Sequence, residues 1–171
     1  MRILIVDDEM VSRTKLELIM EYFGDCQTAE HGEEALAAFH EAHQNRDPFD
    51  LLMLDINLPG MDGIQLLSAI RDAEKQLNID RANRAKILII SSYRDKERIV
   101  ASVQSGCDDY IGKPFEMELI RQKLRKLGIR ETGTSTVPMP TGRTAPTTTD
   151  QIYSEIAGIF WEATADRSGL Y

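Results

Sequence analysis

The chain has 171 residues, of which 42% are hydrophobic and 28% are charged, and its formal net charge is -8. This length supports one well-buried domain with an appendage, and it is too short for two domains of ordinary size. The negative charge disfavours direct DNA binding, because affinity for phosphate backbones relies on clustered Lys and Arg. No apolar run approaches the roughly 20 residues that cross a bilayer, so we expect no membrane association.

Short β-branched runs alternate with amphipathic stretches along the first three quarters of the chain. We expect strands over 2–6, 26–29, 51–54, 87–90 and 109–111, and helices over 11–22, 33–43, 64–77, 96–105 and 116–127. This strict alternation predicts an α/β fold, a doubly wound five-stranded parallel sheet of order 2-1-3-4-5 with helices on both faces. Ligands of such sheets bind at the carboxyl ends of the strands.

Two stretches depart from this alternation. Residues 77–86 are polar and basic, and they indicate a lengthened surface connection whose simplest interpretation is a solvated loop. Residues 132–149 hold eight threonines and three prolines, a composition that cannot bury enough surface to offset its ordering entropy. We therefore expect a domain over 1–127, a Thr/Pro-rich linker over 128–149 and a tail over 150–171.

The tail regains helical spacing and carries no recognised output domain. Asp150 can cap a short amphipathic helix, with one apolar face formed by Ile152, Ile156, Ile159, Phe160 and Ala163. Such a helix is marginal alone in water, so it either docks on a protein surface or forms an inert extension. The first strand ends at acidic residues without the pattern of a secretory signal, and Cys26 and Cys107 are far apart. We expect a cytoplasmic protein with reduced cysteines.

Chemically useful side chains follow several predicted strands. Asp7 and Asp8 follow the first strand, and Asp55 closes the third. Clustered carboxylates repel each other unless a hard cation neutralises them, and Mg²⁺ suits oxygen ligands. Acids at the start of a helix are also stabilised by its dipole, so the pair at Asp7 and Asp8 is weak evidence alone.

Two further strand ends supply groups that bind a phosphoryl oxygen. Lys113, followed by Pro114, lies beyond the fifth strand, and Ser91 ends the fourth. The Ser91 hydroxyl is able to donate to a phosphoryl oxygen, although serine at this position also serves as an N-cap. The Lys113–Pro114 bond is of the kind that adopts the cis form in about 5% of cases.

The sequence resembles the receiver family of bacterial response regulators over residues 1–127. The resemblance rests on Ile-Leu-Ile-Val-Asp-Asp-Glu at the start, on Leu-Met-Leu-Asp-Ile-Asn-Leu-Pro-Gly-Met-Asp-Gly around Asp55, and on Tyr-Ile-Gly-Lys-Pro-Phe around Lys113. It implies a flavodoxin-like receiver fold and phosphorylation on Asp55. It also implies that a histidine kinase or histidine phosphotransfer protein donates the phosphoryl group.

The resemblance assigns a role to each matching residue. It implies Mg²⁺ ligands from the Asp8 and Asp55 side chains and the Asn57 backbone carbonyl, with Asp7 acting through water. Lys113 binds the phosphoryl group and Ser91 is the switch hydroxyl. It implies that the ring of Tyr110 turns inward as the switch operates; the alternative is that the ring only packs at the sheet edge. It also implies that Tyr93 shields the site from water; the alternative is that Tyr93 is only a surface ring.

The implied function is a phosphorylation-dependent switch that changes partner binding, with an unknown output protein. Such a chain is not an enzyme in the ordinary sense, because it catalyses only its own phosphotransfer and autodephosphorylation; homodimer formation stays open. The main alternative is a receiver-like scaffold that is never phosphorylated. A flavodoxin is disfavoured by the acidic turn after the first strand, and an aspartyl phosphatase by Asn57, where a second acid would stand.

Overall fold

Strands and helices alternate throughout the part of the chain described by the structure, a computed structural model that covers residues 1–92 and 96–131. The elements are β1 (Arg2–Val6), α1 (Met10–Met20), β2 (Asp25–Ala29), α2 (Gly32–Gln44), β3 (Leu51–Asp55), α3 (Gly63–Gln76), a 3₁₀ turn η1 (Arg81–Asn83), β4 (Lys86–Ser92), α4 (Lys96–Ser105), β5 (Asp109–Lys113) and α5 (Met117–Lys126). The predictions for Tyr93 and for the linker and tail from residue 132 onwards lie outside the described residues.

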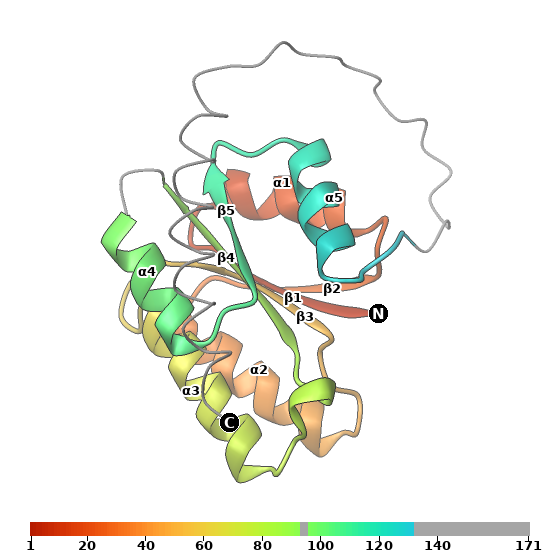
Figure 1. Cartoon of the computed structure of the whole chain (residues 1–171), viewed down its shortest axis with the longest axis vertical. Helices are drawn as coiled ribbons and strands as arrows, with labels where there is room; N and C mark the ends of the chain where they lie inside the picture. Colours follow the sequence, from red (N-terminus) through yellow and green to blue (C-terminus); the bar gives the residue numbers. More distant parts are fainter. Residues whose placement is uncertain (93–95, 132–171) are drawn as a thin grey trace, which may run out of the picture.

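The five strands form one parallel sheet of order β2-β1-β3-β4-β5, which confirms the predicted topology. Helices α2, α3 and α4 cover one face of the sheet, and α1 and α5 cover the other (Figure 1). The doubly wound arrangement follows, because each right-handed crossover places its helix on the face set by the direction of winding. All strands therefore end at the same edge of the sheet.

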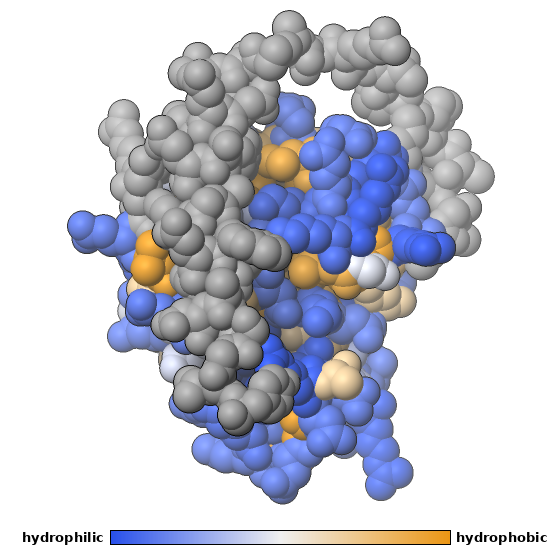
Figure 2. Space-filling view, viewed as in Figure 1, coloured by the Kyte–Doolittle hydropathy of each residue, from blue (hydrophilic) through white to orange (hydrophobic). Residues whose placement is uncertain are grey.

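The central strands β1 and β3 are buried on both faces, which explains their nearly continuous apolar sequences. Ile3 and Ile5 pack toward α1 and α5, while Leu4 and Val6 pack toward α2, α3 and α4. Each fully buried Leu or Ile contributes about 1.5–3 kcal/mol. Outside the residues drawn in grey, the surface seen in Figure 2 is largely hydrophilic, with apolar residues in small separate areas. No helix of the described ranges is both long and apolar enough to cross a membrane.

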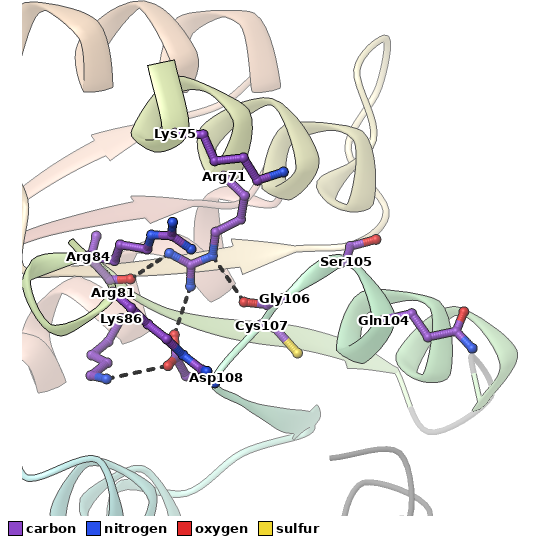
Figure 3. Close-up of a pocket in the computed structure, with 11 residues that line it drawn as sticks. Arg71, Lys75, Arg81, Arg84, Lys86, Gln104, Ser105, Gly106, Cys107 and Asp108 are labelled. Carbon is purple, nitrogen blue, oxygen red and sulfur yellow. Dashed lines mark hydrogen bonds and ion pairs between the residues drawn. The ribbon is translucent and has the colours of Figure 1, made fainter. Parts of the chain in front are cut away.

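The basic connection before β4 is more ordered than a plain solvated loop. The Arg71 guanidinium, from α3, donates to the Glu74 carboxylate at 2.8 Å. It also donates to the Ala85 carbonyl at 2.9 Å and to the Asp108 carboxylate at 2.9 Å (Figure 3). Glu74 in turn accepts a hydrogen bond from the Ala85 amide at 3.0 Å. These bonds tie the end of the connection to α3 and to the residue before β5.

Candidate functional site

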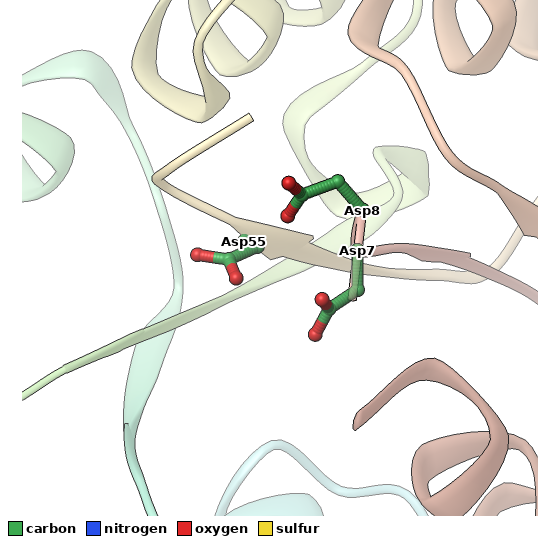
Figure 4. Close-up of side chains that lie close together, drawn as sticks. All are labelled: Asp7, Asp8 and Asp55. Carbon is green, nitrogen blue, oxygen red and sulfur yellow. The ribbon is translucent and has the colours of Figure 1, made fainter. Parts of the chain in front are cut away.

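Three carboxylates meet at the carboxyl edge of the sheet. Asp7 and Asp8 follow β1, and Asp55 is the last residue of the neighbouring strand β3. One oxygen from each of the three side chains lies within 4.8 Å of the others. Figure 4 shows the three side chains gathered around the ends of the two strands. The cluster expected from the strand order is therefore present.

A close backbone approach fixes the loop that follows Asp55. The Gly63 amide donates to the Ile56 carbonyl at 3.0 Å, and a Cβ at Gly63 would lie only 2.0 Å from the Asp55 carbonyl oxygen. Glycine is required here because any side chain would collide with backbone. Asp62 and Gln65 form a capping box at the start of α3, so the loop is held at both ends.

Asp7 is fully buried and its carboxylate is surrounded by donors. One oxygen accepts from the Ser12 hydroxyl at 2.6 Å and from the Lys113 ammonium at 2.9 Å, and the other accepts from the Glu9 amide at 3.0 Å. A buried carboxylate is stable only when its lone pairs are satisfied in this way. The same donors leave Asp7 little capacity for direct contact with a cation.

Asp55 is only 4% exposed, and Lys113 and a backbone amide contact its two oxygens. The Asn57 amide donates to one oxygen at 3.0 Å, and the Lys113 ammonium donates to the other. Burial acts to lower the pKa of Lys113, but hydrogen bonds and charge attraction from Asp55 and Asp7 outweigh burial and raise it. Lys113 is therefore a firmly charged group beside the candidate nucleophile.

Asp8 differs from the other two carboxylates because it is exposed. Among the described residues it forms no hydrogen bond or ion pair. Its oxygens are thus open to a ligand, while Asp55 lies close by. Three carboxylates at one edge form a hard-oxygen donor set that fits a divalent cation such as Mg²⁺.

Arg98, on α4, contacts the loop that follows Asp55. Its guanidinium donates to the Asn57 side-chain oxygen at 2.7 Å, to the Asp62 carboxylate at 3.0 Å and to the Ile56 carbonyl at 3.4 Å. Arg98 therefore joins the first turn of α4 to the segment between Asp55 and α3.

Ser91 and Tyr110 are both buried. The Ser91 hydroxyl donates to the Ser92 carbonyl at 3.2 Å rather than to the carboxylate cluster. The Tyr110 ring is 1% exposed within the core on the α2, α3 and α4 face, and the Lys123 ammonium lies 4.5 Å from its centroid. The Tyr110 ring is thus buried in this structure. The Lys113–Pro114 peptide bond is cis.

Sequence reasoning missed two residues of this site, Ser12 and Arg98. Ser12 has a detectable signal, because it lies in the buried stripe of α1 together with Leu16, Ile19 and Met20, where a hydroxyl needs a partner. Arg98 has no such signal, since its contacts join elements about 40 residues apart. Only the packed arrangement of α4 against the loop reveals it.

Comparisons with known proteins give a family match and several similar proteins. Residues 3–125 match the family model described as "Response regulator receiver domain". The chain is 33% identical over 135 residues to the chemotaxis protein CheY of Pseudomonas aeruginosa, which covers 78% of this chain and all of that protein. It is 36% identical over 126 residues to the probable C4-dicarboxylate response regulator DctR of Bacillus subtilis, covering 72% of this chain but half of that protein.

Solved structures show the same fold. The complex of CheX and CheY with BeF3 and Mg²⁺ from Borrelia burgdorferi has a TM-score of 0.63 at 28% identity, covering 75% of this chain and 90% of that chain. The co-crystal of the Saccharomyces cerevisiae histidine phosphotransfer protein Ypd1 with the receiver domain of Ssk1 has a TM-score of 0.64 at 24% identity, covering 75% of this chain and 88% of that chain. The second likeness supports the fold alone.

Proposed function

The chain belongs to the response regulator receiver family of two-component signalling, and on this basis we propose that it is a switch operated by phosphorylation of Asp55. The observation that carries the proposal is the Lys113 ammonium, which contacts both Asp55 and Asp7 inside a cluster of three carboxylates. This places a fixed positive charge where a phosphoryl group on Asp55 would need one.

The proposed reaction is attack by an Asp55 carboxylate oxygen on a phosphohistidine. A bond forms between that oxygen and phosphorus, the phosphorus–nitrogen bond breaks, and the histidine imidazole leaves and takes up a proton. Lys113 moves from the Asp55 oxygen to an oxygen of the incoming group and neutralises its charge. Asp8, Asp55 and the Asn57 carbonyl are the proposed Mg²⁺ ligands, with Asp7 acting through water. When bound, Mg²⁺ neutralises the carboxylates and the charge that develops on the phosphoryl oxygens.

The proposed switch links this chemistry to α4 and β5. A phosphoryl group on Asp55 adds charge and acceptor oxygens next to the end of β4. The Ser91 hydroxyl, which now donates to a neighbouring carbonyl, then turns to a phosphoryl oxygen. Because Tyr110 is buried against the same face, we propose that this movement changes its packing with α4 and so the surface offered to the output protein.

Exposed apolar residues of α1 suggest where the phosphodonor protein docks. Val11 is 72% exposed and Met10, next to the acidic turn, is 68% exposed. Exposed apolar side chains beside an active centre favour a protein partner, here the histidine kinase or phosphotransfer protein. Val11→Asp is expected to slow transfer from that protein and to leave labelling by acetyl phosphate unchanged. The matched control is Leu77→Asp, at the carboxyl end of α3, because Leu77 is also an exposed apolar residue, with 49% exposure.

Beryllofluoride with Mg²⁺, the combination present in the Borrelia burgdorferi complex, tests the switch without a protein donor. We expect the amide resonances of Ser91, Gly112 and α4 to shift in the wild-type chain and to be unchanged in Asp55→Asn. A wild-type spectrum that does not change when the reagent is added would favour the alternative interpretation, a receiver-like scaffold that is never phosphorylated.

A further inference from the structure

A basic hollow lies at the amino ends of β4 and β5, at the opposite edge of the sheet from Asp55. Its volume is about 540 Å³, and α3, the connection before β4 and the end of α4 form its walls. Figure 3 shows the charged side chains gathered around it. Five cations and one carboxylate line it, namely Arg71, Lys75, Arg81, Arg84, Lys86 and Asp108.

Arg71 has a structural role in this hollow. It is 8% exposed, and its guanidinium is bound by Glu74, Asp108 and the carbonyls of Ala85 and Gly106. Its donors are thus committed to the fold. Arg71 therefore supports the structure of the hollow, and the cations around it are the ones available to bind a ligand.

The other four cations are held loosely or only at the surface. Arg84 lies 3.8 Å from Glu74, and Lys86 lies 3.5 Å from an Asp108 carboxylate that Arg71 already contacts. Within the described ranges, Lys75 pairs only with exposed Asp72, and exposed Arg81 forms no ion pair. These cations outnumber the carboxylates that contact them, so the hollow carries an excess of positive charge although the net charge of the chain is -8.

We propose that this hollow binds a small molecule that carries two or more phosphate groups. Arginine forks match phosphate oxygens in pairs, and several convergent cations favour a ligand with more than one negative charge. The volume is in the range of pockets for molecules of nucleotide size. Gln104 and Ser105, from the end of α4, also line the hollow and supply an amide and a hydroxyl for the rest of the ligand.

The site belongs to the lengthened connection and is independent of phosphorylation on Asp55. Arg81, Arg84 and Lys86 all lie within residues 77–86. Asp55 ends β3 at the carboxyl edge, whereas Lys86 begins β4 at the amino edge. Binding at the hollow therefore persists in Asp55→Asn and without Mg²⁺, which separates this proposal from the proposed switch.

Calorimetric titration of the full chain with inorganic triphosphate in magnesium-free buffer tests the proposal. The double variant Arg81→Gln with Arg84→Gln is expected to bind at least roughly tenfold more weakly than wild type, because two charge-assisted contacts are lost. The matched control is Arg125→Gln with Arg130→Gln, which removes the same charge from exposed positions outside the hollow and should bind like wild type. Equal weakening in both doubles, or no binding by wild type, would overturn the proposal.

Amide chemical shifts during the same titration locate the ligand. We expect changes at Lys75, at residues 84–86 and at residues 104–106; changes confined to Asp7, Asp55 and Lys113 would contradict the proposal. If the double variant has a lower melting temperature than wild type, the single variant Arg81→Gln replaces it.

A synthetic acidic peptide of residues 150–166 is titrated in parallel. Shifts at the hollow with the peptide but not with triphosphate would also reject a phosphorylated small molecule.

Discussion

Among the residues that the structure describes, Lys113 is the single cation that pairs with the two buried carboxylates Asp7 and Asp55. Removing one partner of a buried ion pair leaves an uncompensated charge, which costs about 3–5 kcal/mol. We expect Lys113→Ala to lower the free energy of unfolding by about 3 kcal/mol in EDTA, and excess Mg²⁺ to restore part of that loss. Urea unfolding with and without Mg²⁺ measures both effects.

The pH dependence of this contribution follows from the raised pKa of Lys113. A group whose pKa is higher in the folded protein stabilises it fully below its ordinary pKa, 10.5 for lysine, and loses that effect as pH rises through the raised value. The stability difference between wild type and Lys113→Ala should thus be constant near neutral pH and shrink only in strong alkali. A difference that vanishes at neutral pH would contradict the ion-pair account.

Asp8 is the exposed member of the carboxylate cluster, so neutralising it relieves repulsion without exposing a buried group. We expect Asp8→Asn to abolish Mg²⁺ binding and to raise the melting temperature in metal-free buffer. The rise should be on the order of 2–4 °C, which corresponds to about 1 kcal/mol for a chain of this size. A melting temperature that falls in metal-free buffer would count against the acidic cluster.

At the scale of elements, Arg98 couples α4 to the loop that carries Asn57 and Asp62. Arg98→Ala should release this loop and weaken Mg²⁺ affinity by about tenfold, the low end of the effect of losing an outer-shell partner. The affinity is measured by Mg²⁺ titration, and Arg125→Ala, an exposed arginine on α5, serves as the control. Unchanged affinity in Arg98→Ala would mean that the contact is incidental.

The elements themselves could largely be predicted from the sequence, because hydrophobic periodicity reports burial directly. The order of the strands and the meeting of Asp7, Asp8 and Asp55 followed from alternation alone. The length of β4 could not be predicted: β4 runs from Lys86 to Ser92 rather than over 87–90, since pairing with β3 and β5 on its two sides extends it into polar residues. Nor could the inward position of Tyr110 or the contacts of Arg71 and Arg98, which depend on distant elements.

At the scale of the whole molecule, the described residues contain a complete core. Ile129 packs against the cluster beneath α1 and α5, and Glu131 pairs with Arg121 at 2.9 Å. We propose the division predicted from the sequence, a receiver unit over 1–127, a linker over 128–149 and a short amphipathic helical tail over 150–171, with the first residues of the linker packed on the unit. A chain ending at residue 131 should then melt within a few degrees of the full chain and label equally with acetyl phosphate. A large loss of stability would show that the tail belongs to the fold.

The central claim is that Asp55 accepts the phosphoryl group. The most direct measurement is intact-mass analysis of the chain after incubation with acetyl phosphate and Mg²⁺, with Asp55→Asn and, at an exposed aspartate of α3, Asp72→Asn in parallel. We expect one base-labile phosphoryl adduct on wild type and on Asp72→Asn, and none on Asp55→Asn, because an amide is a poor nucleophile. Undiminished labelling of Asp55→Asn, or no labelling of wild type, would contradict the claim.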